Sequence, residues 1–167
     1  MPNWCDNSAT FHHEDSTKID AIEQELSKEN GGELFNTLYP RPTEEEENWY
    51  TWNCNNWGCK WDANIIDFDR IDANSIVVYF ETPWSPPIAL YEYLTEQGYH
   101  VEALYAESGM CYCGSFNSDN GEDFYEYDLT VRGSWEDIPE EIVEFANLES
   151  HYEWWVEDNQ EEEKNEG

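Results

Sequence analysis

The imbalance of charge is the feature that most limits what this chain can fold into. Among its 167 residues, 39 are Asp or Glu and only 7 are Lys or Arg, which gives a formal net charge of -32 at pH 7. Repulsion on this scale opposes a compact state unless a large apolar core offsets it. The chain has material for such a core in 9 Trp, 11 Tyr and 7 Phe, whereas disordered acidic chains are poor in aromatic residues. We therefore expect a folded domain with an acidic surface.

Length and local charge predict the domain organisation. A chain of 167 residues fits one domain with a short tail. Residues 157–167 contain six acidic residues, one Lys and no apolar side chain. We expect a single domain over residues 1–156, followed by a disordered acidic tail over residues 157–167.

The order of strand-like and helix-like segments indicates the fold class. Strand-like segments cover residues 3–11, 64–68, 75–80 and 99–106, and helix-like segments cover residues 16–28, with Ser16 as the N-cap, and 85–98. This βαββαβ order is that of a ferredoxin-like α+β sandwich. Two more strand-like segments flank Asn120-Gly121, and a short helix-like segment covers residues 139–148. We expect a ferredoxin-like sandwich with an additional C-terminal β-hairpin and helix.

Three motifs of unusual composition resemble a known family. They are Met1-Pro2-Asn3-Trp4-Cys5-Asp6-Asn7, Asn56-Trp57-Gly58-Cys59-Lys60-Trp61-Asp62 and Phe80-Glu81-Thr82-Pro83-Trp84-Ser85-Pro86-Pro87. Their order and spacing resemble those of the Api92-like (YubB-like) ferredoxin-like family of phage and plasmid proteins. The resemblance implies a ferredoxin-like fold and a phage or mobile-element origin, but it implies little about activity. Position 59 is Cys where the family pattern implies Thr, and the C-terminal part is longer and more acidic than that pattern.

The sign and size of the charge favour one kind of partner. The chain repels nucleic acid and anionic membranes, so we expect neither to bind directly, and it attracts basic surfaces. A compact chain of this length is about 40 Å across, and a DNA duplex of that length carries roughly 24 phosphate charges. By analogy with other acidic phage proteins, we expect a counter-defence inhibitor. Its partner would be a host defence, restriction or DNA-handling protein with a basic surface, which it binds by mimicking the charge of DNA.

The alternative is a small ligand-binding or accessory domain whose acidity is a generic solubility or halophilic adaptation. The sequence holds no nucleophile, phosphate-loop or dinucleotide motif, so we expect no enzymatic activity and no cofactor. The N-terminus lacks the basic and apolar segments of a secretory signal, and the sequence has no run of 18 apolar residues. We therefore expect a protein of the host cytoplasm.

Two sets of residues are candidates for binding. The first is acidic and is expected to face the partner: Glu44, Glu45, Glu46, Glu47, Glu122, Asp123, Glu126 and Asp128. The second belongs to the Trp-rich motifs and would line a pocket: Trp57, Lys60, Trp61, Asp62, Trp84 and Ser85. For this second set we favour a structural interpretation, in which the tryptophans form core and Lys60 and Asp62 form a local ion pair.

The cysteines and one acidic segment bear on metal binding, and the aromatic residues bear on self-association. Four thiolates are available from Cys54, Cys59, Cys111 and Cys113, but their spacing is not that of zinc knuckles, so we expect free, mostly buried thiols and no metal. The segment from Asp119 to Asp123 is better explained as a hairpin turn than as a calcium loop. A homodimer would need an apolar contact between two negative bodies, and we expect that contact at the aromatic hairpin around Tyr112 and Phe116.

Overall fold

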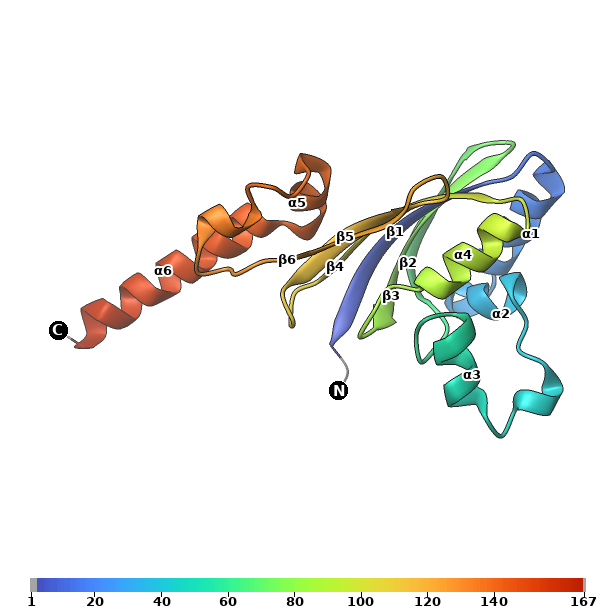
Figure 1. Cartoon of the computed structure of the whole chain (residues 1–167), viewed down its shortest axis with the longest axis horizontal. Helices are drawn as coiled ribbons and strands as arrows, with labels where there is room; N and C mark the ends of the chain where they lie inside the picture. Colours follow the sequence, from blue (N-terminus) through green and yellow to red (C-terminus); the bar gives the residue numbers. More distant parts are fainter. Residues whose placement is uncertain (1–2, 167) are drawn as a thin grey trace.

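The computed structural model describes residues 3–166, and a six-stranded antiparallel sheet forms its centre (Figure 1). The strands are β1 (Trp4–His12), β2 (Asn64–Asp72), β3 (Ser75–Pro83), β4 (His100–Glu107), β5 (Tyr112–Asn117) and β6 (Gly121–Glu126). They are ordered β2-β3-β1-β4-β5-β6. The first four strands have the ferredoxin-like arrangement, and β5 and β6 continue the sheet beyond β4. The predicted sandwich with a C-terminal hairpin is confirmed.

Helices lie on both sides of the sheet. On one side are α1 (Ser16–Leu26), α2 (Leu34–Leu38), α3 (Trp49–Asn56) and α4 (Ile88–Glu96), and on the other are α5 (Glu140–Ala146) and α6 (Leu148–Glu166) (Figure 1). Short 3-10 turns occur at η1 (Glu29–Gly31), η2 (Thr43–Glu45) and η3 (Arg132–Trp135). Helix α6 points away from the sheet and ends at the far tip of the molecule (Figure 1). None of the helices in residues 3–166 is both long and apolar enough to cross a membrane.

The main core lies between the sheet and helices α1 to α4. Along β1, every second residue from Cys5 to Phe11 is buried, as the alternation of a half-buried strand requires. Helix α1 contributes Ile19, Ile22 and Leu26, which the helical period places on one face. Each such side chain stabilises the fold by about 1.5–3 kcal/mol through burial of apolar surface.

A second hydrophobic cluster lies on the opposite face of the sheet, where α5 contacts β4 and β5. Its buried members are Ala106, Cys113, Tyr127, Trp135, Ile138, Ile142, Ala146 and Leu148. The cluster joins the C-terminal segment to the ferredoxin-like unit. It covers one end of this sheet face, around β4 and β5.

Two details differ from the sequence-based expectations. The N-cap of α1 is Asp15 rather than Ser16, because the Asp15 carboxylate accepts a hydrogen bond from the Thr17 amide at 3.0 Å. Residues 157–166, expected to be disordered, continue helix α6, whereas Gly167 lies outside the described residues. Helix α6 begins at the buried Leu148, which packs in a hydrophobic cluster and so favours formation of the first helical turn. The Glu, Gln and Lys residues that follow are strong helix formers.

Candidate functional site

The sheet face turned away from α1 and α4 carries a group of carboxylates. Strand pairing sets Asp6 of β1 opposite Glu81 of β3, and Glu102 of β4 opposite Thr10 of β1. Cross-strand partners project from the same face of an antiparallel sheet. The core is on the other face, since the alternate residues of β1 and β3 are the buried ones.

A β-bulge adds two carboxylates from β2 to this group. The register shifts between Ile65 and Asp67, so that Asp67 lies opposite Tyr79, and Phe68 faces the core. Asp69 then follows on the same side as Asp67. If β2 had no bulge, strict alternation from Ile65 would turn Asp67 toward the core and Phe68 toward solvent. Together, five residues form what we call the acidic sheet face: Asp6, Asp67, Asp69, Glu81 and Glu102.

The spacing of Asp6 and Glu81, and that of Asp67 and Asp69, makes their fields add, whereas Glu102 lies farther away, opposite Thr10. Neighbouring strands lie about 4.8 Å apart, and alternate residues along a strand lie about 6.7 Å apart. Both spacings are below the Debye length of about 8 Å at physiological ionic strength. The effect is visible at Asp6, where partial burial of the carboxyl and the charge of Glu81 raise its pKa, while His151 of α6 acts in the opposite direction.

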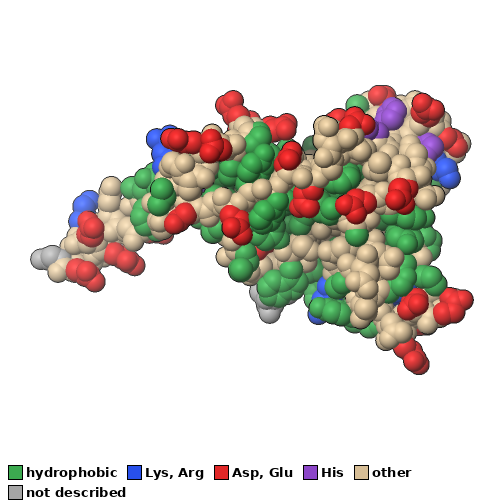
Figure 2. All heavy atoms as spheres, viewed as in Figure 1, with side chains coloured by type: hydrophobic (Ala, Val, Ile, Leu, Met, Phe, Trp, Pro, Cys, Tyr) green, Lys and Arg blue, Asp and Glu red, His purple; other side chains and the backbone are tan. Residues whose placement is uncertain are grey.

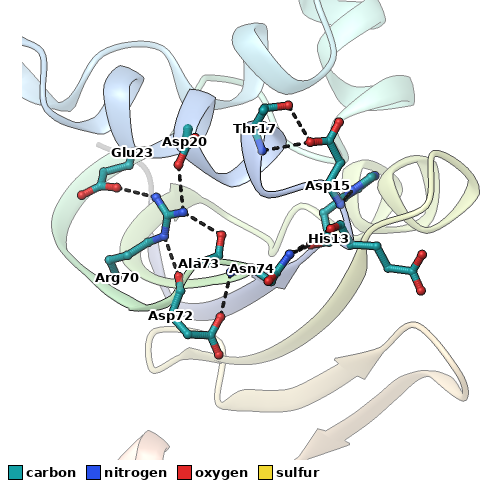
Figure 3. A network of polar contacts seen from close by, with 10 residues as sticks. His13, Asp15, Thr17, Asp20, Glu23, Arg70, Asp72, Ala73 and Asn74 are labelled. Carbon is teal, nitrogen blue, oxygen red and sulfur yellow. Dashed lines mark hydrogen bonds and ion pairs between the residues drawn. The ribbon is translucent and has the colours of Figure 1, made fainter.

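The basic residue of β2 does not neutralise this face. Arg70 turns toward α1, where its guanidinium donates to Asp20 at 2.9 Å and to Glu23 (Figure 3). It also donates to the carbonyl oxygens of Asp72 and Ala73. These contacts, led by the hydrogen bond to Asp20, raise the pKa of Arg70. Its charge is therefore used to fasten the β2–β3 turn to α1.

Other basic side chains are used locally as well. Lys28 pairs with Glu25 at 2.6 Å, and Arg132 pairs with Glu149 at 3.1 Å. Figure 2 shows acidic side chains spread over the sheet and both helical layers, with few basic ones among them. The negative potential of the acidic sheet face is thus reinforced by its surroundings.

A polar groove adjoins the acidic sheet face where α5 approaches β4 and β5. It has a volume of about 360 Å³, and its polar lining comes from Ser8, Thr10, Glu102, Ser115, Asn117 and Glu141. Hydroxyl, amide and carboxylate oxygens are the acceptors that Lys and Arg side chains need. The groove therefore offers several acceptors to a cationic side chain.

A second hollow lies on the helical side of the sheet, between the turn that precedes α4 and strands β5 and β6. Its volume is about 300 Å³. We call it the aromatic groove and define it by Pro86, Ile88, Tyr105, Tyr112, Glu122 and Phe124. The ring centroids of Tyr105 and Tyr112 are 6.2 Å apart, and those of Tyr112 and Phe124 are 5.3 Å apart. The buried Tyr105 donates its hydroxyl hydrogen to Glu122 Oε1 at 2.6 Å.

The eight acidic residues predicted to bind a partner do not form one surface. Glu44 to Glu47 lie in and after η2, between α2 and α3. On β6, Glu122 and Glu126 are on the helical side of the sheet, whereas Asp123 lies opposite Ser115 on the other side. Asp128 accepts hydrogen bonds from Thr130 in the turn beyond β6. Adjacent residues of a strand point in opposite directions, so the residues of β6 are divided between its two faces. That these eight residues contact a partner stays a prediction.

Three of the six predicted pocket residues have structural roles. Trp57 is buried in the core, and its indole N–H donates to the Tyr39 carbonyl at 3.0 Å. The Asp62 carboxylate accepts from the amides of Phe35 and Asn36, at the start of α2. The Ser85 hydroxyl donates to the Gly58 carbonyl at 2.8 Å, at the rim of the aromatic groove.

The other three pocket candidates lie at the surface. Trp61 and Trp84 are exposed, and the Lys60 ammonium lies 4.5 Å from the ring centroid of Trp61. The expected Lys60–Asp62 ion pair is therefore wrong, because Lys60 takes an aromatic partner and Asp62 takes backbone amides. These six residues do not line a common pocket.

The cysteines are divided between the two faces of the sheet. Cys59 belongs to the main core, and Cys111 and Cys113 belong to or pack against the second cluster. Four thiolates are thus not brought together. Burial raises the pKa of the Cys59 thiol and raises that of Cys113 to about 11, so both stay protonated at neutral pH.

The structure also places the segment from Asp119 to Asp123 and the aromatic hairpin around Tyr112 and Phe116. Residues 118–120 form the turn between β5 and β6, with the Asp119 amide bonded to Asn117 Oδ1 at 2.8 Å. Phe116 is buried against Tyr91, so it cannot serve a dimer interface, and Phe124 is the exposed aromatic residue of this hairpin.

The acidic sheet face was not predicted from the sequence, because its carboxylates are not neighbours in a run of acidic residues. Part of the signal was present in β1, where Asp6, Ser8 and Thr10 alternate with buried residues. Asp67 and Asp69 had no such signal, because their side is decided by the bulge.

Fold and surface together define a ferredoxin-like α+β protein with an extended sheet, an acidic sheet face and an aromatic groove. Residues 60–145 match the family model described as a ferredoxin-like domain in Api92-like protein, and the chain belongs to this Api92-like family. The resemblance to the Api92-like family is thereby confirmed.

The chain is also similar to a solved structure. The crystal structure of a protein api92 from Yersinia pseudotuberculosis is 21% identical, with a TM-score of 0.42. The similarity covers 56% of this chain and 39% of that chain, so this chain spans well under half the length of that protein. No curated protein matches.

Proposed function

We propose that this protein binds a basic surface on another protein through its acidic sheet face and does not act as an enzyme. The observation that carries the proposal is the gathering of carboxylates from β1, β2, β3 and β4 on one side of the sheet. Asp6, Asp67, Asp69 and Glu102 are exposed there, and Glu81 is half-buried. A flat surface of one sign attracts a surface of the other sign and steers its approach.

We propose a host defence or DNA-handling protein as the target, in the cytoplasm of a host cell. A surface that holds DNA neutralises phosphates with Lys and Arg. The acidic sheet face offers such a surface a substitute for phosphates, so binding would exclude DNA and inhibit the target. Inhibition of such a host protein would serve a phage as a counter-defence.

The alternative is that the acidity serves solubility or a halophilic habit, and that the domain has an unrelated accessory or ligand-binding role. In that case the position of the acidic residues would not matter. The two possibilities are distinguished by neutralising the same number of carboxylates at two different places on the surface and comparing the effects on binding.

The experiment compares two triple variants with equal changes of charge. The first, Asp67→Asn/Asp69→Asn/Glu81→Gln, neutralises the acidic sheet face. The matched control, Glu161→Gln/Glu162→Gln/Glu163→Gln, neutralises exposed positions on α6. Each is used in pull-downs from bacterial lysate at about 50 and about 200 mM salt, a range over which phosphate-like contacts weaken strongly.

We expect the wild type and the α6 variant to retain the same one or two DNA-handling proteins at low salt and to release them at moderate salt. The sheet-face variant should retain neither, and the purified target should lose DNA binding when the wild type is added. Equal loss of binding in both variants, a broad set of basic proteins, or retention that salt does not affect would contradict the proposal. A melting temperature that rises in molar salt would support the halophilic alternative instead.

A further inference from the structure

We propose that the aromatic groove binds the side chain of an arginine supplied by a basic partner. The groove lies on the opposite side of the sheet from the acidic sheet face. It is defined by different residues, although the inference rests on the proposed function in taking the partner to be basic.

The rings of the groove supply a surface for a planar cation. Tyr112 and Phe124 stand side by side at the mouth, and Tyr105 is buried beneath them. Phe124 is 52% exposed, so its ring is available to a ligand. A guanidinium stacks on the faces of such rings and is attracted by their quadrupoles.

The Glu122 carboxylate lies beside the rings, where it can contact the guanidinium of a bound arginine. Glu122 is exposed, and its Oε1 accepts the Tyr105 hydroxyl at 2.6 Å. Its Oε2 has no hydrogen-bond partner within residues 3–166 and can accept a guanidinium N–H. Burial and the Glu122 carboxylate raise the pKa of Tyr105, so this phenol remains a donor at neutral pH.

No Lys or Arg forms a salt bridge with Glu122 within residues 3–166. The sequence from Ile71 to Val131 contains neither Lys nor Arg, and this stretch includes all six residues that define the groove. Gly58 also lines the groove, and the ammonium of Lys60, two residues away, lies 4.5 Å from the ring centroid of Trp61. The negative charge of the groove is therefore left for a ligand. Charge complementarity thus selects a cation over a neutral apolar side chain.

The nearby start of α4 does not make the groove an anion site. Pro86 and Pro87 have no N–H groups to offer. The Ile88 amide donates to the Pro86 carbonyl, and the Leu90 amide donates to the Trp57 carbonyl. These donors are absent or occupied, and Ala89 does not line the groove, so the aromatic groove presents mainly rings and a carboxylate.

Anchoring elements hold this geometry in place. The Tyr112 hydroxyl donates to the carbonyl of Trp84 and so ties β5 to the turn before α4. Gly114 lies under Tyr105, and an added Cβ there would come within 2.4 Å of the Tyr105 hydroxyl. The site is therefore formed before any ligand arrives, which lowers the cost of binding.

The test uses N-acetyl-arginine amide and its neutral isostere N-acetyl-citrulline amide, titrated into the full chain and followed by amide chemical shifts. The variant Glu122→Gln removes the charge but keeps an acceptor for Tyr105. Its matched control is Asp123→Asn, which makes the same change of charge one residue along β6, on the opposite face. A second variant, Phe124→Ala, removes an exposed ring without touching the core.

We expect the arginine compound to shift amides of β5, β6 and residues 84–88, and the citrulline compound to bind at least about fivefold more weakly. Glu122→Gln should weaken binding about tenfold, Phe124→Ala should weaken it severalfold, and Asp123→Asn should leave it nearly unchanged. Equal binding of both compounds, equal effects of the two charge variants, or no shifts in the groove would overturn the inference.

Failure here is distinguishable from failure of the proposed function. The sheet-face variant Asp67→Asn/Asp69→Asn/Glu81→Gln should bind N-acetyl-arginine amide as the wild type does. If instead it loses this binding, the inference is overturned, because the cation is then held by the general field and not by the groove.

Discussion

The side-chain amide of Asn7 donates a hydrogen bond to Thr82 Oγ1 at 2.9 Å and so joins two motifs that lie 75 residues apart in the chain. Thr82 in turn donates to the Ser85 carbonyl at 2.6 Å, and the Ser85 hydroxyl donates to the Gly58 carbonyl at 2.8 Å. This chain of contacts passes through all three motifs that resemble the Api92-like family. The motifs are therefore explained in large part by the polar contacts that hold β1, β3 and the start of α4 together.

The first prediction concerns Thr82, which is fully buried. Thr82→Val keeps the shape of the side chain but leaves the Asn7 amide and the Ser85 carbonyl without this partner. We expect a loss of about 1–3 kcal/mol in the free energy of unfolding, measured by urea denaturation. Thr82→Ser keeps the hydroxyl and should lose clearly less. An unchanged urea midpoint for Thr82→Val, or a larger loss for Thr82→Ser than for Thr82→Val, would contradict a stabilising role of these hydrogen bonds.

The second prediction concerns the start of α2. Asp62 Oδ1 accepts from the amides of Phe35 and Ala63, and Oδ2 accepts from the amide of Asn36. Asp62→Ala removes all three acceptor contacts, and we expect it to lower the free energy of unfolding by about 1–3 kcal/mol. Asp62→Asn keeps one oxygen, so its free energy of unfolding should lie between those of the wild type and Asp62→Ala. An unchanged urea midpoint for Asp62→Ala would rule out this capping role.

The third prediction concerns the buried glycine of β5. A Cβ at Gly114 would lie 2.2 Å from the Asp123 carbonyl and 2.5 Å from Tyr105 Cζ. Gly114→Ala should therefore displace Tyr105 from Glu122 and cost about 1–3 kcal/mol of stability through overpacking. Near-ultraviolet circular dichroism and thermal melting would report both effects. Asp119→Asn, in the turn of the same hairpin, is a control that should leave both signals near those of the wild type.

The fourth prediction concerns the dependence of stability on pH. Because the pKa of Asp6 in the folded protein is raised above its ordinary 3.8, the folded state binds more protons just above that pH. Its contribution to stability therefore falls as the pH rises from 3.8 through the raised value. Asp6→Asn should remove this loss and raise the melting temperature slightly at pH 7, with no gain below about pH 3.

Glu81 supplies the check on this prediction, since its charge is one cause of the shift at Asp6. Glu81→Gln should also stabilise the protein at pH 7, and the double variant should gain less than the two single gains combined. Fully additive gains would show that the two carboxylates do not interact.

The sequence by itself determined the βαββαβ order of the ferredoxin-like unit and many residues of the main core. In β1 polar residues largely alternate with apolar ones, in β3 a run of β-branched and aromatic residues marks a strand, and in α1 the spacing of Ile19, Ile22 and Leu26 marks one face. Such local periods are set by backbone geometry, so they can be recognised in a sequence. The Trp-rich helix α3 and the long helix α6 were missed, because neither has a clear apolar period.

Only the tertiary structure decided which charges share a surface. Two acidic neighbours such as Glu122 and Asp123 look alike in the sequence, yet one lies at the aromatic groove and the other on the opposite face. Asp67 joins the acidic sheet face because a single extra residue in β2 reverses the alternation that its sequence alone would predict. The physical reason is that side chains change sides at every residue of a strand, so the face depends on strand pairing across the whole sheet.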